Sequence, residues 1–159
     1  MLHDTKIDIS KAKREKLIAL LNQRLADASD LKSQAKQAHW NVKGQNFIAL
    51  HELFDKVAGE LDVHVDDIAE RVTTLGGTAM GTVRLAAKNS SLSEYPHEIT
   101  DGTAHVDALS TAMADFGKKV RADIDASDKL GDADTADLFT GISRSIDKLL
   151  WFVEAHIQS

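Results

Sequence analysis

Residues 46–75 read NFIALHELFDKVAGELDVHVDDIAERVTTL, a pattern from which the helical architecture can be predicted. No proline interrupts it, and its apolar residues recur at spacings of three and four, as on one face of an amphipathic helix. These residues are Leu50, Phe54, Val57, Leu61, Val65, Ile68 and Val72. Gly76 and Gly77 follow directly, and glycine is common just after a helix. We therefore predict one long helix from about Asn46 to Leu75.

Two pairs of potential metal ligands lie on this predicted helix. His51 and Asp55 are four residues apart, and so are Asp66 and Glu70, so each pair shares a helix face. At about 100° per residue, Asp55 and Asp66 also point in nearly the same direction. A rise of about 1.5 Å per residue nevertheless separates them by roughly 16 Å. One metal ion cannot bridge that distance, so a single chain offers only two half-sites.

A two-fold axis would bring the two half-sites together. If two copies of the helix cross antiparallel at their common midpoint, Asp55 of one chain meets Asp66 of the other. By the same symmetry His51 meets Glu70, and one interface contains two identical sites. His39, at the end of the preceding predicted helix, could complete each site.

The ligand types indicate the metal. The chain has no cysteine, so thiolate sites and disulfides are excluded. Mixed imidazole and carboxylate ligands suit Fe(II), Mn(II) or Zn(II), and a site open to water and oxidant favours redox iron. The alternative for each pair taken alone is a solvated surface pair on an exposed helix face. The other histidines have no comparable partners, and we interpret them as structural or surface residues: His3, His64, His97, His105 and His156.

Three further long helices are predicted by the same kind of apolar spacing. The first opens near Asp8 or Ser10 and ends near Gly44, the third begins at Thr100 or Asp101, and the fourth begins near Asp134. The stretch from 76 to 100 is too long for a turn, and 82–88 could form a short helix within it. So long a connection would let the second and third helices run parallel, as in ferritin-like bundles.

These elements predict an all-α fold, a ferritin-like four-helix bundle with a long crossover between its second and third helices. We expect one ferritin-like domain over residues 1–159, with residues 1–8 as a short N-terminal tail. With 43% apolar and 28% charged residues, the composition is that of a globular chain. The sequence shows no apolar signal segment and no bilayer-length apolar run. We therefore expect a cytoplasmic location and no membrane partner.

The charge of the chain bears on nucleic-acid binding. The formal net charge is −6, and an acidic chain repels DNA phosphate unless its cations are gathered in one place. Residues 1–16 carry five cationic and three acidic side chains, a net charge of +2, but most of these cations fall within the first predicted helix. DNA remains an open alternative partner, one whose binding would depend strongly on salt.

Several of these segments together resemble the Dps family (DNA-binding protein from starved cells), whose members are mini-ferritins. The resemblance covers most of the chain and rests on these segments: QAHWNVKG (37–44), FIALHELFD (47–55), IAER (68–71), LGG (75–77), TADLF (135–139) and DKLLWF (147–152).

The resemblance implies the chemistry and the assembly. It implies a hollow dodecamer with 23 symmetry, in which ferroxidase sites at two-fold interfaces oxidise Fe(II), preferentially with hydrogen peroxide. Ferric mineral is stored inside, which protects against oxidative damage. By motif, the catalytic and metal-binding residues of a di-iron site are His39, His51 and Asp55 of one chain with Asp66 and Glu70 of the partner subunit. The resemblance also implies that Trp40 stands beside the site.

One acidic segment has two interpretations. Six aspartates lie between the third and fourth predicted helices: Asp123, Asp125, Asp128, Asp132, Asp134 and Asp137. This acidic turn would suit the iron-entry pores that the resemblance implies at a three-fold axis. The alternative is a solvated loop that caps a helix.

Overall fold

The structure is a computed structural model that describes residues 2–158. It contains four long helices and one short one: α1 (Lys11–Asn41), α2 (Phe47–Thr74), α3 (Val83–Asn89), α4 (Gly102–Lys129) and α5 (Ala133–Glu154). The described residues form no strand, and an isolated bridge pairs Lys43 with Asp101. No helix in this part of the chain combines the length and apolar character needed to cross a bilayer. The fold is all-α, as predicted.

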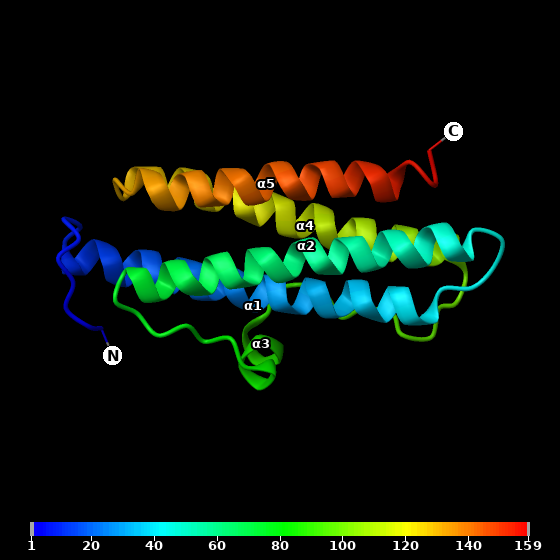
Figure 1. Ribbon diagram of the computed structural model, residues 1–159, viewed down its shortest axis with the longest axis horizontal. Helices are drawn as coiled ribbons and strands as arrows, with labels where there is room; N and C mark the ends of the chain where they lie inside the picture. The colour runs from blue at the N-terminus through cyan, green and yellow to red at the C-terminus, as the bar shows by residue number, and fades with distance from the viewer. Residues whose placement is uncertain (1, 159) are drawn as a thin grey trace.

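The four long helices form two antiparallel hairpins, α1 with α2 and α4 with α5 (Figure 1). The connection from α2 to α4 carries α3 and runs along the outside of α1 back to the other end of the bundle. There the backbone N–H of Lys43 donates to the carbonyl of Thr100 at 2.9 Å. The α2 and α4 helices therefore run parallel, which confirms the prediction made from the long connection.

The core lies where the apolar faces of the four long helices meet. Phe54, Phe116 and Phe139 come from three different helices and are fully buried. Of the seven apolar positions predicted on α2, all but the partly buried Val65 are 0–2% exposed. Complete burial of one such side chain contributes roughly 1.5–3 kcal/mol. Packing of this stripe therefore holds α2 in the bundle along its whole length.

Polar residues begin the helices close to the predicted positions. Asp101 accepts a hydrogen bond from the backbone of Ala104, and Asp132 accepts one from Thr135, so both satisfy free N–H groups of a first turn. Thr82 does the same for α3, which lies one residue beyond the predicted 82–88. Ser10 occupies the N-cap position of α1 without a side-chain bond. All five helices thus exist where the sequence placed them.

The N-terminal segment is docked rather than extended from the bundle. The backbone N–H of His3 donates to Gly76 at 2.7 Å, and the buried Arg14 guanidinium donates to the carbonyls of His3 and Leu75. Gly76 has φ +85°, and a Cβ there would lie 2.6 Å from the His3 carbonyl oxygen. Leu2 and His3 of the predicted tail therefore lie against the end of α2, and residue 1 lies outside the described residues.

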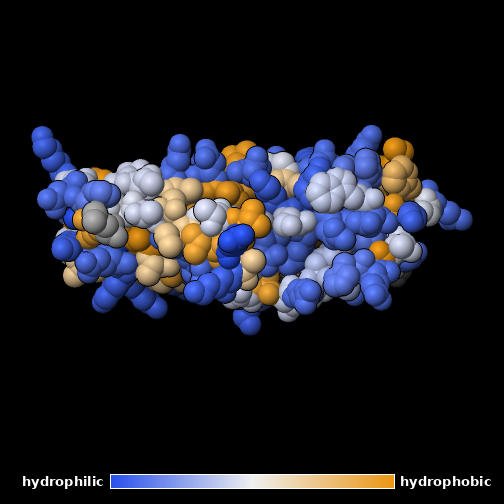
Figure 2. Space-filling model, turned by 90° about the horizontal axis from the view of Figure 1, so that it is seen from below, coloured by the Kyte–Doolittle hydropathy of each residue, from blue (hydrophilic) through white to orange (hydrophobic). Residues whose placement is uncertain are grey.

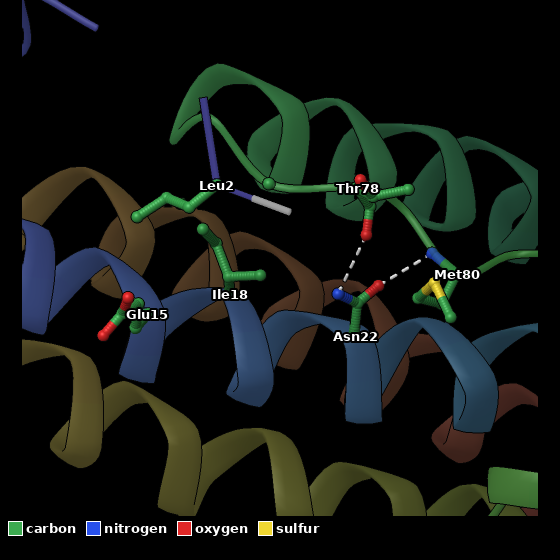
Figure 3. A pocket seen from close by; sticks show the side chains of 7 residues that line it. Leu2, Glu15, Ile18, Asn22, Thr78 and Met80 are labelled. Carbon is green, nitrogen blue, oxygen red and sulfur yellow. Dashed lines mark hydrogen bonds between the residues drawn. The ribbon is translucent and has the colours of Figure 1, made fainter. Parts of the chain in front are cut away.

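The surface near this segment is partly apolar. Figure 2 views the side that carries α3, where apolar side chains gather over one half and the other half is mostly hydrophilic. Figure 3 shows an open pocket between the N-terminal segment, α1 and the connection after α2. Its Asn22 side chain donates to the Thr78 carbonyl and accepts from the Met80 N–H. Asn22 thereby fixes this connection against the first half of α1, whereas His39 lies in its last turn.

The Asp-rich segment is not the acidic turn that the sequence suggested. Helix α4 continues to Lys129 and α5 begins at Ala133, so most of the six aspartates are helical. Asp123 and Asp132 are buried and paired with Arg24 and Arg71 respectively. The other four are exposed: Asp125, Asp128, Asp134 and Asp137. The prediction was wrong because periodic apolar residues mark the core-facing side of a helix and leave its end undefined.

Candidate metal centre

His39 and His51 lie side by side at the end of the α1–α2 hairpin. Their rings are stacked, with centroids 3.7 Å apart and planes inclined by 20°. The Nδ1 atom of His39 is 2.7 Å from the His51 carbonyl oxygen, and the Nδ1 atom of His51 is 2.8 Å from the His39 carbonyl oxygen. This reciprocal pair of hydrogen bonds fixes the direction of both rings.

The same hydrogen bonds determine which nitrogens are free. A carbonyl oxygen can only accept, so Nδ1 carries the hydrogen on both rings. In neutral imidazole the Nε2 atoms are then left with lone pairs. Metal-binding histidines commonly donate their other ring N–H to a carbonyl or carboxylate in this way. Both side chains are only partly buried, so each ring is oriented to offer Nε2 as a ligand.

Asp55 lies one turn after His51 and is held by a lysine of the other helix. The Lys36 ammonium donates to Asp55 at 2.6 Å, and this hydrogen bond holds the pKa of the Asp55 carboxyl below its usual value. The Asp55 side chain is nevertheless 57% exposed. It is therefore an ionised and accessible carboxylate, the form that binds a cation. Lys36 was not recognised as part of this site from the sequence.

Asp66 and Glu70 lie farther along α2, on exposed turns. No group of three or more His, Asp or Glu in residues 2–158 of one chain could hold a metal ion. The structure thus brings His39 and His51 together beside Asp55 and leaves Asp66 and Glu70 apart from them. The five predicted ligands do not form one complete site within a single chain.

Two large aromatic residues lie next to the histidine pair, Phe47 against the His51 ring and Trp40 directly after His39 in the chain. Trp40 is 66% exposed, and the Lys36 ammonium lies 5.6 Å from its ring. The Phe47 ring lies 5.1 Å from that of His51. Exposed aromatic surface of this kind is typical of sites that are covered by another chain.

The remaining histidines lie apart from this group. His64 and His105 are buried, whereas His3, His97 and His156 are exposed. His105 does have a partner that the sequence did not reveal, because its Nδ1 atom is 2.7 Å from the hydroxyl of Tyr95. The connection before α4 brings Tyr95 back over that helix, and no local spacing rule predicts such a return.

Comparison with known proteins first establishes the class. The Ferritin family model, described as a ferritin-like domain, matches residues 18–159. A Dps structure from Vibrio cholerae, titled as a member of a broad superfamily of ferritin-like diiron-carboxylate proteins, shares the fold with a TM-score of 0.91 at 24% identity and covers 99% of both chains. The chain contains a ferritin-like domain.

Two more similar proteins establish the family within that class. The DNA protection during starvation protein of Agrobacterium fabrum is 46% identical over 98% of this chain and 96% of its own length. A Dps structure from Mycobacterium smegmatis has a TM-score of 0.95 at 31% identity, with 100% of this chain and 96% of the other covered. The chain belongs to the Dps family.

Proposed function

We propose that this protein is a ferroxidase that oxidises Fe(II), preferentially with hydrogen peroxide, and stores the ferric product. The observation that carries the proposal is the reciprocal hydrogen bonding of His39 and His51, which aims two Nε2 atoms outward beside the ionised Asp55. The diiron-carboxylate title of the Vibrio cholerae neighbour supports iron as the substrate.

The second half of each site is assigned to a second copy of the chain. His39, His51 and Asp55 of one chain would face Asp66 and Glu70 of the partner subunit across a two-fold axis. The proposed ligands are imidazole nitrogens and carboxylate oxygens, which suit iron, and the chain has no cysteine that could replace them. The exposed Trp40 and Phe47 would be covered by the same contact.

Paired iron sites suit a two-electron oxidant. Two Fe(II) ions give one electron each to hydrogen peroxide, which takes up two protons and leaves as two water molecules. No hydroxyl radical is released when both electrons arrive together. Fe(II) and peroxide that react by one electron at a time would produce hydroxyl radical, and the paired two-electron reaction avoids this damage, so it is protective.

Storage requires a closed assembly. We propose a hollow dodecamer with 23 symmetry, entered by iron through pores lined with carboxylates. Asp123 and Asp132 are buried in ion pairs and are removed from the pore candidates. The exposed aspartates of the same segment remain: Asp125, Asp128, Asp134 and Asp137. We place the assembly in the cytoplasm.

The experiment is peroxide-driven iron oxidation by site variants. In the double variant His51→Asn with Asp55→Asn, the asparagine at 51 keeps a donor for the His39 carbonyl but removes the Nε2 ligand. After anaerobic Fe(II) loading, peroxide should give rapid ferric absorbance in the wild type and a loss of that fast phase in the variant. An unchanged rate would refute the site assignment.

The matched control removes an exposed ion-pair carboxylate on another helix. Asp147 of α5 is exposed and pairs with Arg121, so Asp147→Asn removes one surface carboxylate without touching a proposed ligand or the proposed two-fold contact. This control should retain the fast phase. Replacing peroxide by dioxygen in the same assay tests the oxidant, and a dioxygen rate equal to or above the peroxide rate would contradict the stated preference.

A second function, DNA binding with association to the nucleoid, is favoured by the name of the Agrobacterium fabrum relative and by exposed lysines near the N-terminus. The docked N-terminal segment and the net charge of −6 oppose it. A gel shift at low salt tests it, with Lys6→Gln, Lys11→Gln and Lys16→Gln combined as the variant. These lysines are exposed, so the variant preserves the contacts of Arg14. No shift of wild-type protein at low salt would refute this function.

A further inference from the structure

A buried polar pair lies outside the candidate metal centre. Tyr95, in the connection from α3 to α4, and His105, near the start of α4, are 7% and 1% exposed. The phenolic oxygen lies 2.7 Å from the Nδ1 atom of His105, and the two rings are stacked with centroids 6.0 Å apart. Tyr95 is the only tyrosine of the chain.

Hydrogen-bond accounting gives the direction of the bond. If the phenol donates to Nδ1, the only unsatisfied polar hydrogen left is the one on Nε2 of His105. The reverse arrangement would leave both the phenolic hydrogen and the Nε2 lone pair without a partner. Burial raises the pKa of Tyr95. Burial also lowers the pKa of His105, although the Asp101 carboxylate and the backbone of Ile99 and Asn41 act to raise it. A neutral phenol therefore donates to a neutral base.

An aromatic residue connects this pair to the helix that carries the metal ligands. The ring of the fully buried Phe54 lies 6.4 Å from that of His105. Phe54 immediately precedes Asp55 and lies one turn after His51 in α2. The rings of Tyr95, His105 and Phe54 thus follow one another inside the bundle, and the α2 backbone links Phe54 to His51 and Asp55.

From this series we infer that Tyr95 is a one-electron donor that quenches oxidising equivalents formed at the metal centre, with His105 as the acceptor of its proton. The inference rests on the proposed function, because the oxidant is the hydroxyl radical formed when a single Fe(II) reduces peroxide by one electron. Neutral tyrosine, neutral histidine and hydroxyl radical give tyrosyl radical, imidazolium and hydroxide. The electron goes to the radical and the phenolic proton to Nδ1, so charge and atoms balance.

The location of the pair suits this reaction. An ionised phenolate would be costly in the core, but simultaneous transfer of the electron and the proton leaves the phenoxyl oxygen uncharged. The imidazolium that forms lies close to the Asp101 carboxylate, which favours it. Burial also keeps the resulting phenoxyl radical away from solvent, so it cannot couple with other chains. The oxidising equivalent is held inside the protein.

Freeze-quench electron paramagnetic resonance tests the inference. The assembly is loaded anaerobically with Fe(II) at half occupancy, so that single-electron events occur, and then mixed with peroxide. The wild type should give a tyrosyl signal, and Tyr95→Phe, which keeps the ring, should lose it. Because the chain has one tyrosine, the signal needs no further assignment. Trp151→Phe, at an exposed tryptophan of α5 outside the proposed site, is the control and should keep the tyrosyl signal.

The role of His105 has its own measurement. In His105→Gln the tyrosyl spectrum should shift in its g-tensor, or the radical should be lost, because its hydrogen-bond partner has changed. An unshifted signal of equal yield would contradict proton transfer to His105. A contact that merely anchors the connection before α4 would give no radical in any variant.

An iron-free measurement separates this inference from the proposed function. A photo-excited ruthenium tris-bipyridine with persulfate oxidises proteins by one electron without iron. If ferric absorbance never develops but light produces the Tyr95 radical, the proposed function fails and the redox pair stands. If ferric absorbance develops normally and neither treatment gives a tyrosyl signal, the proposed function stands and this inference is overturned.

Discussion

At the scale of single residues, the candidate metal centre depends on contacts between helices. His51 and Asp55 were predicted from spacing, because two groups four residues apart share a helix face, whereas His39 was predicted from the family motif. The exchange of hydrogen bonds between His39 and His51 could not be predicted, since it joins side chains and carbonyls across the hairpin. The Lys36–Asp55 ion pair depends on the same hairpin geometry.

The Lys36–Asp55 ion pair predicts competition between lysine and metal. We expect Lys36→Gln to bind Co(II), as a redox-stable probe, more tightly than the wild type, because no ammonium has to leave Asp55. The gain should be at most about fivefold, since exposed ion pairs contribute little. Isothermal titration at constant ionic strength measures it. Weaker binding by the variant would show instead that Lys36 supports the site.

At the scale of helices, the existence and the order of the helices could be predicted from the sequence. The burial of particular polar residues could not. Periodicity placed α2 within a residue or two of its observed ends. Asp123 looked like part of an acidic turn because its partner Arg24 lies in α1, far away in the sequence. The guanidinium of Arg24 is 2.5 Å from the carboxylates of both Asp27 and Asp123.

This buried cluster of two carboxylates and one guanidinium predicts a pH-dependent stability. Burial raises the pKa of Asp123 to about 6, although Arg24 opposes the shift. A carboxyl with a raised pKa in the folded state contributes stability that is fully present below its unfolded pKa and is lost as pH rises through about 6. The loss from Asp123 should amount to roughly 3 kcal/mol between acid and neutral pH.

Denaturant unfolding of Asp123→Asn checks this prediction. The variant should lose much of the decline in unfolding free energy that the wild type shows between about pH 5 and about pH 7.5. Asp115→Asn is the control, because Asp115 is an exposed member of an ion pair with Lys119. An Asp123→Asn variant with the full wild-type pH dependence would show that Asp123 is ionised throughout this range.

The junction after α2 gives a second prediction at this scale. Gly76→Ala forces a side chain into the left-handed region and against the His3 carbonyl oxygen, so it should destabilise the protein by about 1–2 kcal/mol or more. It should also release the N-terminal segment, which limited proteolysis would detect as early cleavage near residue 8. The control Gly141→Ala meets no atom within 4 Å and should be neutral or stabilising. Equal stability of both variants would contradict the docking of the segment.

At the scale of the whole molecule, the chain is half of its own proposed site. Asp55 and Asp66 share one side of α2 but lie roughly 16 Å apart along it, and no single-chain group of ligands suffices among residues 2–158. The spacing on one helix therefore predicts an oligomer. Such a prediction can seldom be made from local sequence rules alone. The two-fold axis that completes the site would also be one of the symmetry axes of the proposed dodecamer.

Chain mixing tests the shared site most directly. His51→Ala chains and Glu70→Ala chains are each dissociated and reassembled alone, and then reassembled as an equal mixture. A mixed two-fold dimer has one doubly defective site and one site with all its ligands. Random pairing should therefore restore fast peroxide-dependent iron oxidation at about one quarter of the sites, while each variant alone stays inactive. A mixture as inactive as its two components would contradict a site built from two chains.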